Sequence, residues 1–261
     1  MEILSKIGAH TVCITSSDDA LIAECKSLFS FNQVRPKRAD LHINLIRGVE
    51  KPFTSYQVQV SKNDKGVVYN REDFYIITDE HYEKASITVH NSLALKHSIM
   101  TLFSGLITHQ EWGILLHSSC VLEGEAAHIF TGRSGAGKST AAQLSAPRPL
   151  LSDEASIIRV DPEKGVVVYH SPFRSEMMES GGEGPFKLES LNLLHQSLDN
   201  RRSKMGKAEA FLLLMDKVFY WSMNKKDVQI ISKILQQVIQ NTDVYHLHFK
   251  KDPTFWEMMS S

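Results

Sequence analysis

Residues 132–139 read Gly-Arg-Ser-Gly-Ala-Gly-Lys-Ser, which is the complete GxxxxGK[ST] pattern of a phosphate-binding loop. In such a loop, backbone N–H groups surround the phosphates of a nucleotide, a lysine contacts the outer phosphates and a hydroxyl ligates Mg²⁺. The last two roles would fall to Lys138 and Ser139. The nucleotide-binding residues that we predict are Gly132, Ser134, Gly135, Ala136, Gly137, Lys138, Ser139 and Thr140. The loop therefore predicts a site for a nucleoside triphosphate and Mg²⁺.

The segments on both sides of this loop suit the motif. Residues 126–131 (AAHIFT) have the apolar character of a buried strand, and residues 139–144 (STAAQL) can form a helix. A strand–loop–helix setting lets N–H groups at the start of the helix face anions. A Gly/Ser-rich turn that matches the pattern by accident would lack this setting, so we interpret the segment as a nucleotide-binding loop.

An acidic pair, Asp153-Glu154, follows a short apolar run downstream of the loop. A helix over 138–146 would descend ~12 Å at 1.5 Å per residue, and a strand over 150–153 would climb back ~13 Å at 3.3 Å per residue. The two carboxylates are therefore expected at the level of the phosphates, where they can ligate Mg²⁺ together with Ser139. The alternative interpretation is a solvated strand end.

A histidine upstream of the loop is the next candidate. A hairpin with its turn at Glu123-Gly124 would pair His117 with Phe130. His117 would then lie just below Gly132, where its imidazole could contact a phosphate, help to bind metal or orient a substrate. A histidine in a strand is often a core residue with satisfied hydrogen bonds, and this is the alternative.

Further candidates lie in the C-terminal half of the chain. Arg174, in the stretch SPFRSE, could neutralise the charge of a phosphoryl group in transfer. Segment 179–185 (ESGGEGP) has the glycine content either of a mobile loop that closes over substrate or of a plain surface loop. His246 and His248 share one strand face, but no acidic or thiol group is expected near them, so no zinc site is predicted there.

The composition limits the classes of function. A formal net charge of −1 provides no long-range field for nucleic acid or an anionic membrane. Three widely spaced cysteines indicate neither a disulfide framework nor a zinc site. No apolar stretch has the length of a membrane span, and the N-terminus lacks a signal pattern. We therefore expect a cytoplasmic protein without nucleic-acid or membrane partners.

The chain is expected to have two parts, a β-rich accessory module over 1–90 and a nucleotide-binding catalytic domain over 91–261. Strands are expected over 11–15, 41–46, 56–60, 66–69, 74–78, 85–90, 114–122, 125–131, 150–153, 155–160, 165–170, 211–215 and 244–249. Helices are expected over 18–29, from a cap at Asn91 to before Gly113, and over 139–144, 188–198 and 228–239. Hairpins on both sides of the phosphate loop argue against a parallel, helix-alternating sheet. The predicted fold class is α/β with mixed, largely antiparallel sheets.

The ordered set of His117-Ser118-Ser119, the loop 132–139 and the run 151–154 resembles the HPr kinase/phosphorylase family. It also resembles, more distantly, the ATP-dependent phosphoenolpyruvate carboxykinases of the same fold. The resemblance covers about half of the chain, over 113–249. It implies an HPr kinase-like P-loop domain preceded by a small β-rich α+β module. Small stand-alone members of this group resemble kinases that phosphorylate a serine of ribosomally made precursors such as lasso peptides.

The resemblance also implies roles for residues. The lysine of the family's loop binds phosphates and its hydroxyl ligates magnesium, which match Lys138 and Ser139, and the family's active-site histidine matches His117. The usual Asp-Asp pair is Asp153-Glu154 here, so the division of base and metal roles between these two carboxylates stays open. The long C-terminal signature by which HPr kinases dock their carrier protein is not found, which argues against HPr as the substrate.

The predicted activity is that of an ATP-dependent serine kinase, which transfers the γ-phosphoryl group to a serine hydroxyl of a peptide or protein. Asp153 or Glu154 would accept the hydroxyl proton, and Lys138, His117 and Arg174 would hold the phosphates. The alternatives are a small-molecule kinase of the same fold and a non-kinase ATPase or nucleotide-sensing protein. The apolar face of the predicted C-terminal helix could support a homo-oligomer. The sequence leaves open the acceptor, phosphorolysis, the oligomeric state and the role of the N-terminal module.

Overall fold

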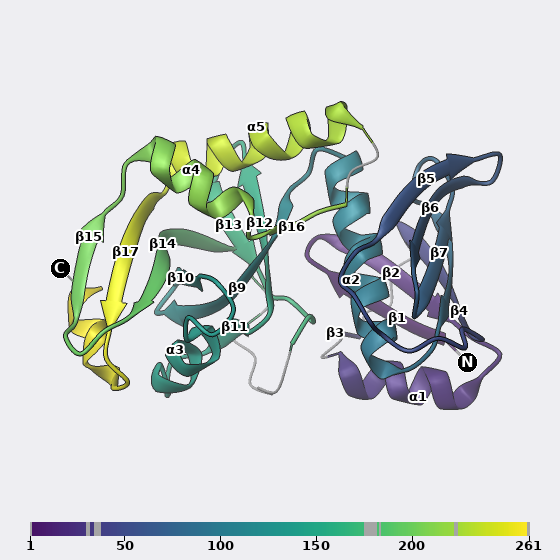
Figure 1. Ribbon diagram of the computed structural model, residues 1–261, viewed down its shortest axis with the longest axis horizontal. Helices are drawn as coiled ribbons and strands as arrows, with labels where there is room; N and C mark the ends of the chain where they lie inside the picture. The colour runs from purple at the N-terminus through teal and green to yellow at the C-terminus, as the bar shows by residue number, and fades with distance from the viewer. Residues whose placement is uncertain are drawn as a thin grey trace. The chain divides into compact units, whose positions relative to one another are not determined.

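The structure is a computed structural model in which the chain divides into two compact units (Figure 1). Unit 1 comprises Met1–Glu111 and Tyr220–Val228, and unit 2 comprises Trp112–Phe219 and Gln229–Ser261. The structure describes residues 2–29, 32–33, 38–174, 182, 184–221 and 224–259. Each unit combines helices with a mixed sheet, so the protein is a mixed α/β protein. Among the described helices, none is both long and apolar enough to cross a membrane.

An eight-stranded sheet forms the centre of unit 1, in the order β3-β1-β2-β4-β8-β7-β6-β5. Its strands are β1 (Glu2–Ile7), β2 (His10–Thr15), β3 (Asn32–Gln33), β4 (Leu41–Arg47), β5 (Gln59–Asn63), β6 (Gly66–Arg71), β7 (Phe74–Thr78) and β8 (Lys84–Val89). The pairs β2–β4 and β4–β8 are parallel, and the other neighbours are antiparallel. Six of these strands were predicted, although β5 begins later than expected. Strand β1 was missed because the middle one of its three inward positions is the fully buried Ser5, which interrupts the apolar alternation of Ile3 and Ile7.

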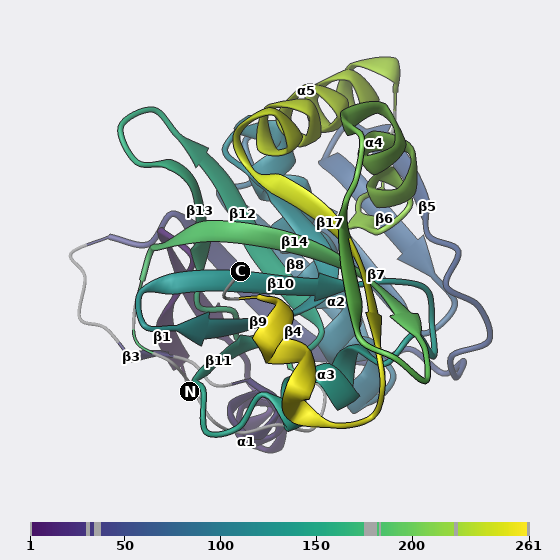
Figure 2. The ribbon, with the colours of Figure 1, turned by 90° about the vertical axis from the view of Figure 1, so that its left-hand side faces the viewer.

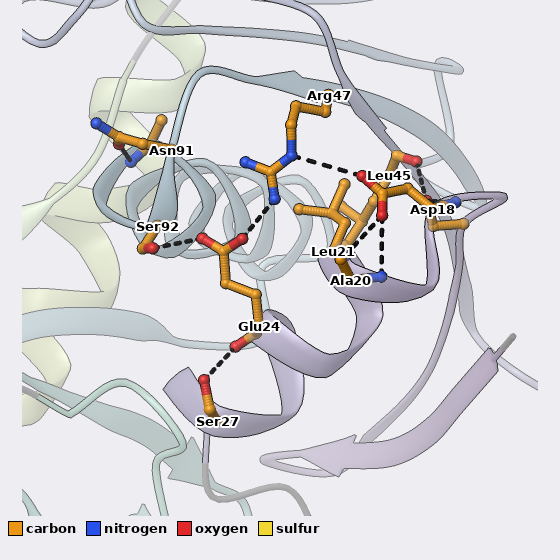
Figure 3. A network of polar contacts seen from close by, with 11 residues as sticks. Asp18, Ala20, Leu21, Glu24, Ser27, Leu45, Arg47, Asn91 and Ser92 are labelled. Atoms are coloured by element: carbon orange, nitrogen blue, oxygen red, sulfur yellow. Dashed lines mark hydrogen bonds and ion pairs between the residues drawn. The ribbon is translucent and has the colours of Figure 1, made fainter.

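Polar contacts hold the starts of helices α1 (Asp19–Leu28) and α2 (Ser92–His109) of unit 1 (Figure 3). Asp18 caps α1 by accepting from two N–H groups of its first turn, and Asn91 caps α2 by accepting from the N–H group of Ala94. Glu24 of α1 accepts a hydrogen bond from Arg47 of β4 at 2.5 Å and another from the Ser92 hydroxyl of α2. One carboxylate thereby joins two helices and a strand.

Helix α2 belongs to unit 1, which corrects the predicted domain boundary. The boundary was expected between residues 90 and 91, and it falls after Glu111. The reason is that α2 packs on β7, β8 and α1. At Gly105 the helix comes so close to the sheet that a Cβ would lie 2.4 Å from the Tyr69 hydroxyl. That hydroxyl is hydrogen-bonded to the hydroxyl of Tyr82 at 2.6 Å.

The sheet of unit 2 has nine strands and follows the path β10-β9-β12-β13-β14-β17-β15, with β11 and β16 paired to β9. Its strands are β9 (Ile114–Glu123), β10 (Ala126–Thr131), β11 (Leu150–Ser152), β12 (Ala155–Asp161), β13 (Gly165–Tyr169), β14 (Phe186–Gln196), β15 (Arg201–Lys204), β16 (Val218–Phe219) and β17 (Asp243–Phe249). Its helices are α3 (Lys138–Leu144), α4 (Lys207–Met215), α5 (Lys225–Asn241, which begins in unit 1) and the 3-10 helix η1 (Pro253–Met258). Strand β14 runs parallel to β10 and β17, so the expected mixed sheet is confirmed.

Two predicted elements of unit 2 are wrong. The segment expected as a helix over 188–198 is strand β14, which pairs with β10, β13 and β17 and is buried along most of its length. A short apolar run suits a buried helix or a central strand equally, and the partners on both sides decide for the strand. The segment expected as a strand over 211–215 is helix α4. It buries Ala210 and Leu214 and exposes Leu212, a spacing of buried positions that is typical of a helix.

The two faces of the unit 2 sheet have different chemical character. On one face Phe130, Leu194 and Phe249 pack in a hydrophobic core with residues of α3 and the aromatic side chains of η1. On the other face His246 of β17 bonds to Glu209 of α4. Figure 2 shows α3 and α4 on opposite sides of these strands. The phosphate-loop motif therefore joins β10 to a helix on the apolar face, while a polar layer lies under α4.

Candidate functional site

The phosphate-loop motif lies between the end of β10 and the start of α3, as expected from its flanking segments. Gly135 and Gly137 have positive φ angles of 76° and 104°, a conformation that favours glycine. Gly137 also has no room for a side chain, because a Cβ there would lie 2.7 Å from the Phe249 ring. The backbone bond from the Ala136 N–H to the Arg133 carbonyl, at 3.0 Å, closes the turn.

Neighbouring strands hold the loop in place. The Gln196 amide at the end of β14 donates to the Gly135 carbonyl at 2.7 Å. The Ser119 hydroxyl of β9 donates to the Lys138 carbonyl at 3.1 Å. Because both partners belong to the sheet, the loop is tied at two points to a rigid element. Such preorganisation is what a phosphate-binding backbone requires.

The Lys138 side chain folds back over the loop. Its ammonium donates to the carbonyls of Gly132 and Arg133 at 3.2 and 3.3 Å. Burial lowers the pKa of Lys138, and the nearby charge of Lys217 lowers it further. An anion beside the loop would relieve this repulsion. Of the predicted nucleotide-binding residues, Ser134, Gly135 and Ser139 are exposed, so the loop surface and the Ser139 hydroxyl are accessible to a ligand.

His117 lies nearer to the loop than predicted. Strand β10 pairs Phe130 with Ser119 and Thr131 with Ser118, so the expected pairing of His117 with Phe130 is wrong. The turn contains residues 124–125 instead of Glu123-Gly124, which moves β9 along β10. The Thr131 hydroxyl donates to the His117 carbonyl at 2.7 Å, at the last residue before the loop.

The ring of His117 is neutral at neutral pH. Burial, with the charges of Lys138 and Lys217, lowers the pKa of His117 to about 4. The ring also packs on Phe219, with centroids 5.2 Å apart. His117 can therefore act as a hydrogen-bonding group beside Lys138, but not as a permanent cation.

The acidic pair lies in the link between β11 and β12. Both strands pair with β9, and Ala155 is opposite His117. The Ser118 N–H donates to the Glu154 carbonyl at 3.1 Å. Asp153 is only 3% exposed, whereas Glu154 is half-buried. The backbone therefore brings Asp153, Glu154 and His117 to adjoining strands.

Arg174 has a different environment from the one expected of a phosphate ligand. Its side chain is buried, and its Nη2 donates to His170 Nε2 at 2.9 Å and lies 3.4 and 3.5 Å from the carbonyls of Leu150 and Leu151. Burial lowers the pKa of Arg174, and the nearby Asp153 opposes that shift. Arg174 thus contacts the carbonyls of strand β11 next to Asp153, and its predicted contact with a phosphoryl group stays a prediction. Most of the glycine-rich segment 179–185 lies outside the described residues.

Lys217 is a candidate that the sequence did not reveal. It directly precedes β16, which pairs with β9, and its carbonyl accepts from the His117 N–H at 2.8 Å. Its ammonium lies 2.5 Å from Asp216, and its charge lowers the pKa values of both Lys138 and His117. No local motif marks this lysine, because only the long-range pairing of β16 brings it to the loop.

A cavity of about 670 Å³ lies beside the phosphate loop. Its walls come from four segments of unit 2, namely Gly132, Arg133, Ser134, Gly135 and Ala136 of the loop, Leu193, Leu194, His195 and Gln196 of β14, Leu213 of α4, and Lys217. Small ligands occupy cavities of this size class. The cavity combines apolar walls with the cations Arg133 and Lys217, which suits a ligand that has both an organic part and negative charge.

A polar cluster adjoins this cavity and corrects one expectation. No acid was expected near His246, yet Glu209 of α4 lies 3.0 Å from it and His195 lies 2.9 Å from it on the other side. Across the described ranges, no group of three or more His, Cys, Asp or Glu residues is arranged to hold a metal ion. Glu209, His246 and His195 form a chain of hydrogen bonds, and His195 lines the cavity.

The geometry defines a candidate site at the phosphate loop, formed by the loop itself, His117, the acidic pair and Lys217. Among known proteins, no family model matches the chain, and the curated proteins contain no match to it.

Proposed function

We propose that the protein is an ATP-dependent serine kinase with an HPr kinase-like P-loop domain in unit 2. The observation that carries this proposal is that the complete phosphate loop, two lysines and two carboxylates are all positioned by strand β9 and its neighbours. Lys138 folds over the loop, Lys217 lines the adjoining cavity, and Asp153 and Glu154 lie across β9 from both. Phosphoryl transfer requires cations for the phosphates and a carboxylate for the acceptor, and this site offers both.

The donor set also fits magnesium. An exposed hydroxyl at Ser139 and carboxylates at Asp153 and Glu154 are the hard oxygen ligands that Mg²⁺ takes. When bound, the metal would neutralise charge on the phosphates. Because Asp153 is nearly fully buried and Glu154 is not, we assign Asp153 to the metal side and Glu154 to the acceptor side.

In the proposed reaction the serine oxygen attacks the γ-phosphorus of ATP. A new O–P bond forms as the bond from phosphorus to the β–γ bridging oxygen breaks, and ADP leaves. Glu154 takes the hydroxyl proton. Lys138 and Lys217 hold the phosphates, and the neutral His117 ring orients them by hydrogen bonding. Arg174 holds the Asp153 segment in place from beneath.

We propose a peptide or protein as the acceptor and the cytoplasm as the compartment. A ribosomally made precursor peptide of the lasso type is the substrate class that the resemblance favours. Two alternatives would use the same loop, namely phosphorylation of a small-molecule alcohol and ATP hydrolysis or sensing without transfer. The products of the reaction distinguish them from the proposed activity.

The test is incubation of the purified protein with Mg-ATP and a panel of seryl peptides, followed by intact-mass spectrometry. We expect one added phosphoryl group on a seryl peptide, absent with Lys138→Met and strongly reduced with Glu154→Gln. The matched control is Glu125→Gln, in the β9–β10 turn away from the acidic pair. ATP consumption without a phosphorylated peptide would refute the peptide acceptor, and absence of ATP binding would refute the nucleotide site.

A further inference from the structure

Three histidines lie together on the sheet face that α4 covers, His195 from β14 and His246 and His248 from β17. The parallel pairing of these strands places His195 opposite His248. His195 Nε2 is 2.9 Å from His246 Nδ1, and the His195 ring stacks on His248 with centroids 4.7 Å apart. His195 also lines the cavity beside the phosphate loop. It therefore connects the histidine cluster to the candidate nucleotide site.

Hydrogen bonding determines which nitrogen of each ring carries a proton. His246 Nε2 lies 3.0 Å from Oε1 of Glu209, and an ionised carboxylate can only accept, so His246 is protonated on Nε2. The Nδ1 of a neutral His246 must then accept from the Nε2–H of His195. A neutral His195 is left with an unprotonated Nδ1. This nitrogen is where the ring can take a further proton.

The charges around His195 decide when it does so. Burial lowers the pKa of His195, as do the two histidines of β17 and Arg133 of the loop. Lys217 lies in the same cavity wall, and Arg201 of β15 approaches His248 at 3.4 Å. All of these groups disfavour a second proton while the cavity holds no anion. The negative charges of a polyphosphate would offset Arg133 and Lys217 and favour the charged form of His195.

We propose that His195 takes up one proton when a nucleoside triphosphate enters the cavity, so that nucleotide binding is proton-coupled through the chain Glu209–His246–His195. The inference rests on the proposed nucleotide site. The proton comes from solvent and binds Nδ1 of His195, while no bond to phosphorus forms or breaks. The Glu209 carboxylate stabilises the imidazolium through His246, because its bond to His246 Nε2 keeps His246 Nδ1 as the acceptor for His195. His195 is thus positively charged when the nucleotide is bound and neutral when it is absent.

The experiment is calorimetric titration with a non-hydrolysable ATP analogue and Mg²⁺ in pairs of buffers that differ in ionisation enthalpy, from pH 5.5 to 8. Heat differences between buffers give the protons taken up per nucleotide. The variant His195→Gln measures the protons exchanged on binding by groups other than His195, including the ligand. The variant His81→Gln changes an exposed residue of unit 1 and is the matched control. We expect up to one extra proton for the wild type and the control. Relative to His195→Gln, their affinity should rise up to tenfold per pH unit of acidification, because the group has a higher pKa in the complex.

Glu209→Gln tests the far end of the chain, and its half-exposed side chain makes misfolding of this variant a minor concern. We expect a smaller proton uptake than in the wild type. A wild-type readout that depends on no variant is the carbon NMR titration of the His195 ring, which should move to higher pH when the analogue is bound. Equal proton uptake in the wild type and His195→Gln, or an unmoved ring titration, overturns the proposal while the nucleotide site stands. Failure to bind both the analogue and inorganic tripolyphosphate overturns the nucleotide site and this inference together.

Discussion

Replacing Gly137 with alanine tests whether the shape of the phosphate loop depends on its contact with Phe249. The φ of 104° at Gly137 would strain a non-glycine residue by about 1–2 kcal/mol. The added Cβ would lie 2.7 Å from the Phe249 ring, which is buried and packs on Phe255. Such overpacking costs about 1–3 kcal/mol. We therefore expect Gly137→Ala to lower the free energy of unfolding by about 2–5 kcal/mol.

The assay is urea unfolding followed by tryptophan fluorescence, with Gly135→Ala as the matched control. Gly135 lies in the same loop with a φ of 76°, but nothing lies within 4 Å of the position that an added Cβ would take. The control should therefore lose only the backbone part, about 1–2 kcal/mol. Phe249→Leu in a double-mutant cycle isolates the contact, because the smaller side chain leaves room for the new methyl group. The coupling energy should be about 1–3 kcal/mol in the favourable direction.

Two results would refute this reasoning. Equal destabilisation by Gly137→Ala and Gly135→Ala would show that the Phe249 contact contributes nothing. Strictly additive effects of Gly137→Ala and Phe249→Leu would show the same. Nucleotide binding by the folded fraction of Gly137→Ala is then the functional readout, and we expect it to be weaker because the loop backbone must shift.

The remaining predictions concern charge. Lys217→Gln should weaken Mg-ATP binding about tenfold, equivalent to about 1.4 kcal/mol. It should also raise the pKa of His117 in an NMR titration. An unchanged affinity would place the ammonium away from the phosphates. Arg174→Met should lower the free energy of unfolding by about 3 kcal/mol, because His170 and two backbone carbonyls lose their buried donor. A loss of only about 0.5 kcal/mol in urea unfolding, the size of a surface change, would contradict this. The pKa values of His97, His117 and His170 are lowered from 6.5 to about 4. Between pH 6.5 and pH 4 the unfolded chain thus binds more protons than the folded chain, so the free energy of unfolding should fall on acidification. Each of the three histidines should contribute up to about 1.4 kcal/mol of this fall per pH unit. Stability that stays constant over this range would contradict the burial of these rings.

The sequence by itself determined the parts that depend on short stretches of chain. The loop 132–139 is recognisable because its glycines, its lysine and its serine stand within eight consecutive positions. Asn91 identified the start of α2 because a cap bonds to N–H groups of the adjacent turn. The helix after the loop and the short strand before Asp153 followed from the local pattern of residues. In each case the interaction is local, so the order of residues suffices to predict it.

Tertiary structure decided what depends on segments far apart in the chain. The pairing of β16 with β9 brings Lys217 to His117, and the parallel pairing of β14 with β17 brings His195 to His246. The contacts of Arg174 with the carbonyls of β11 likewise join segments that are 23 and 24 residues apart in the chain. Strand β14 itself was predicted as a helix, because an apolar run acquires its conformation from the strands that pair with it. These contacts arise from pairing across the sheet, for which a single sequence contains no local signal.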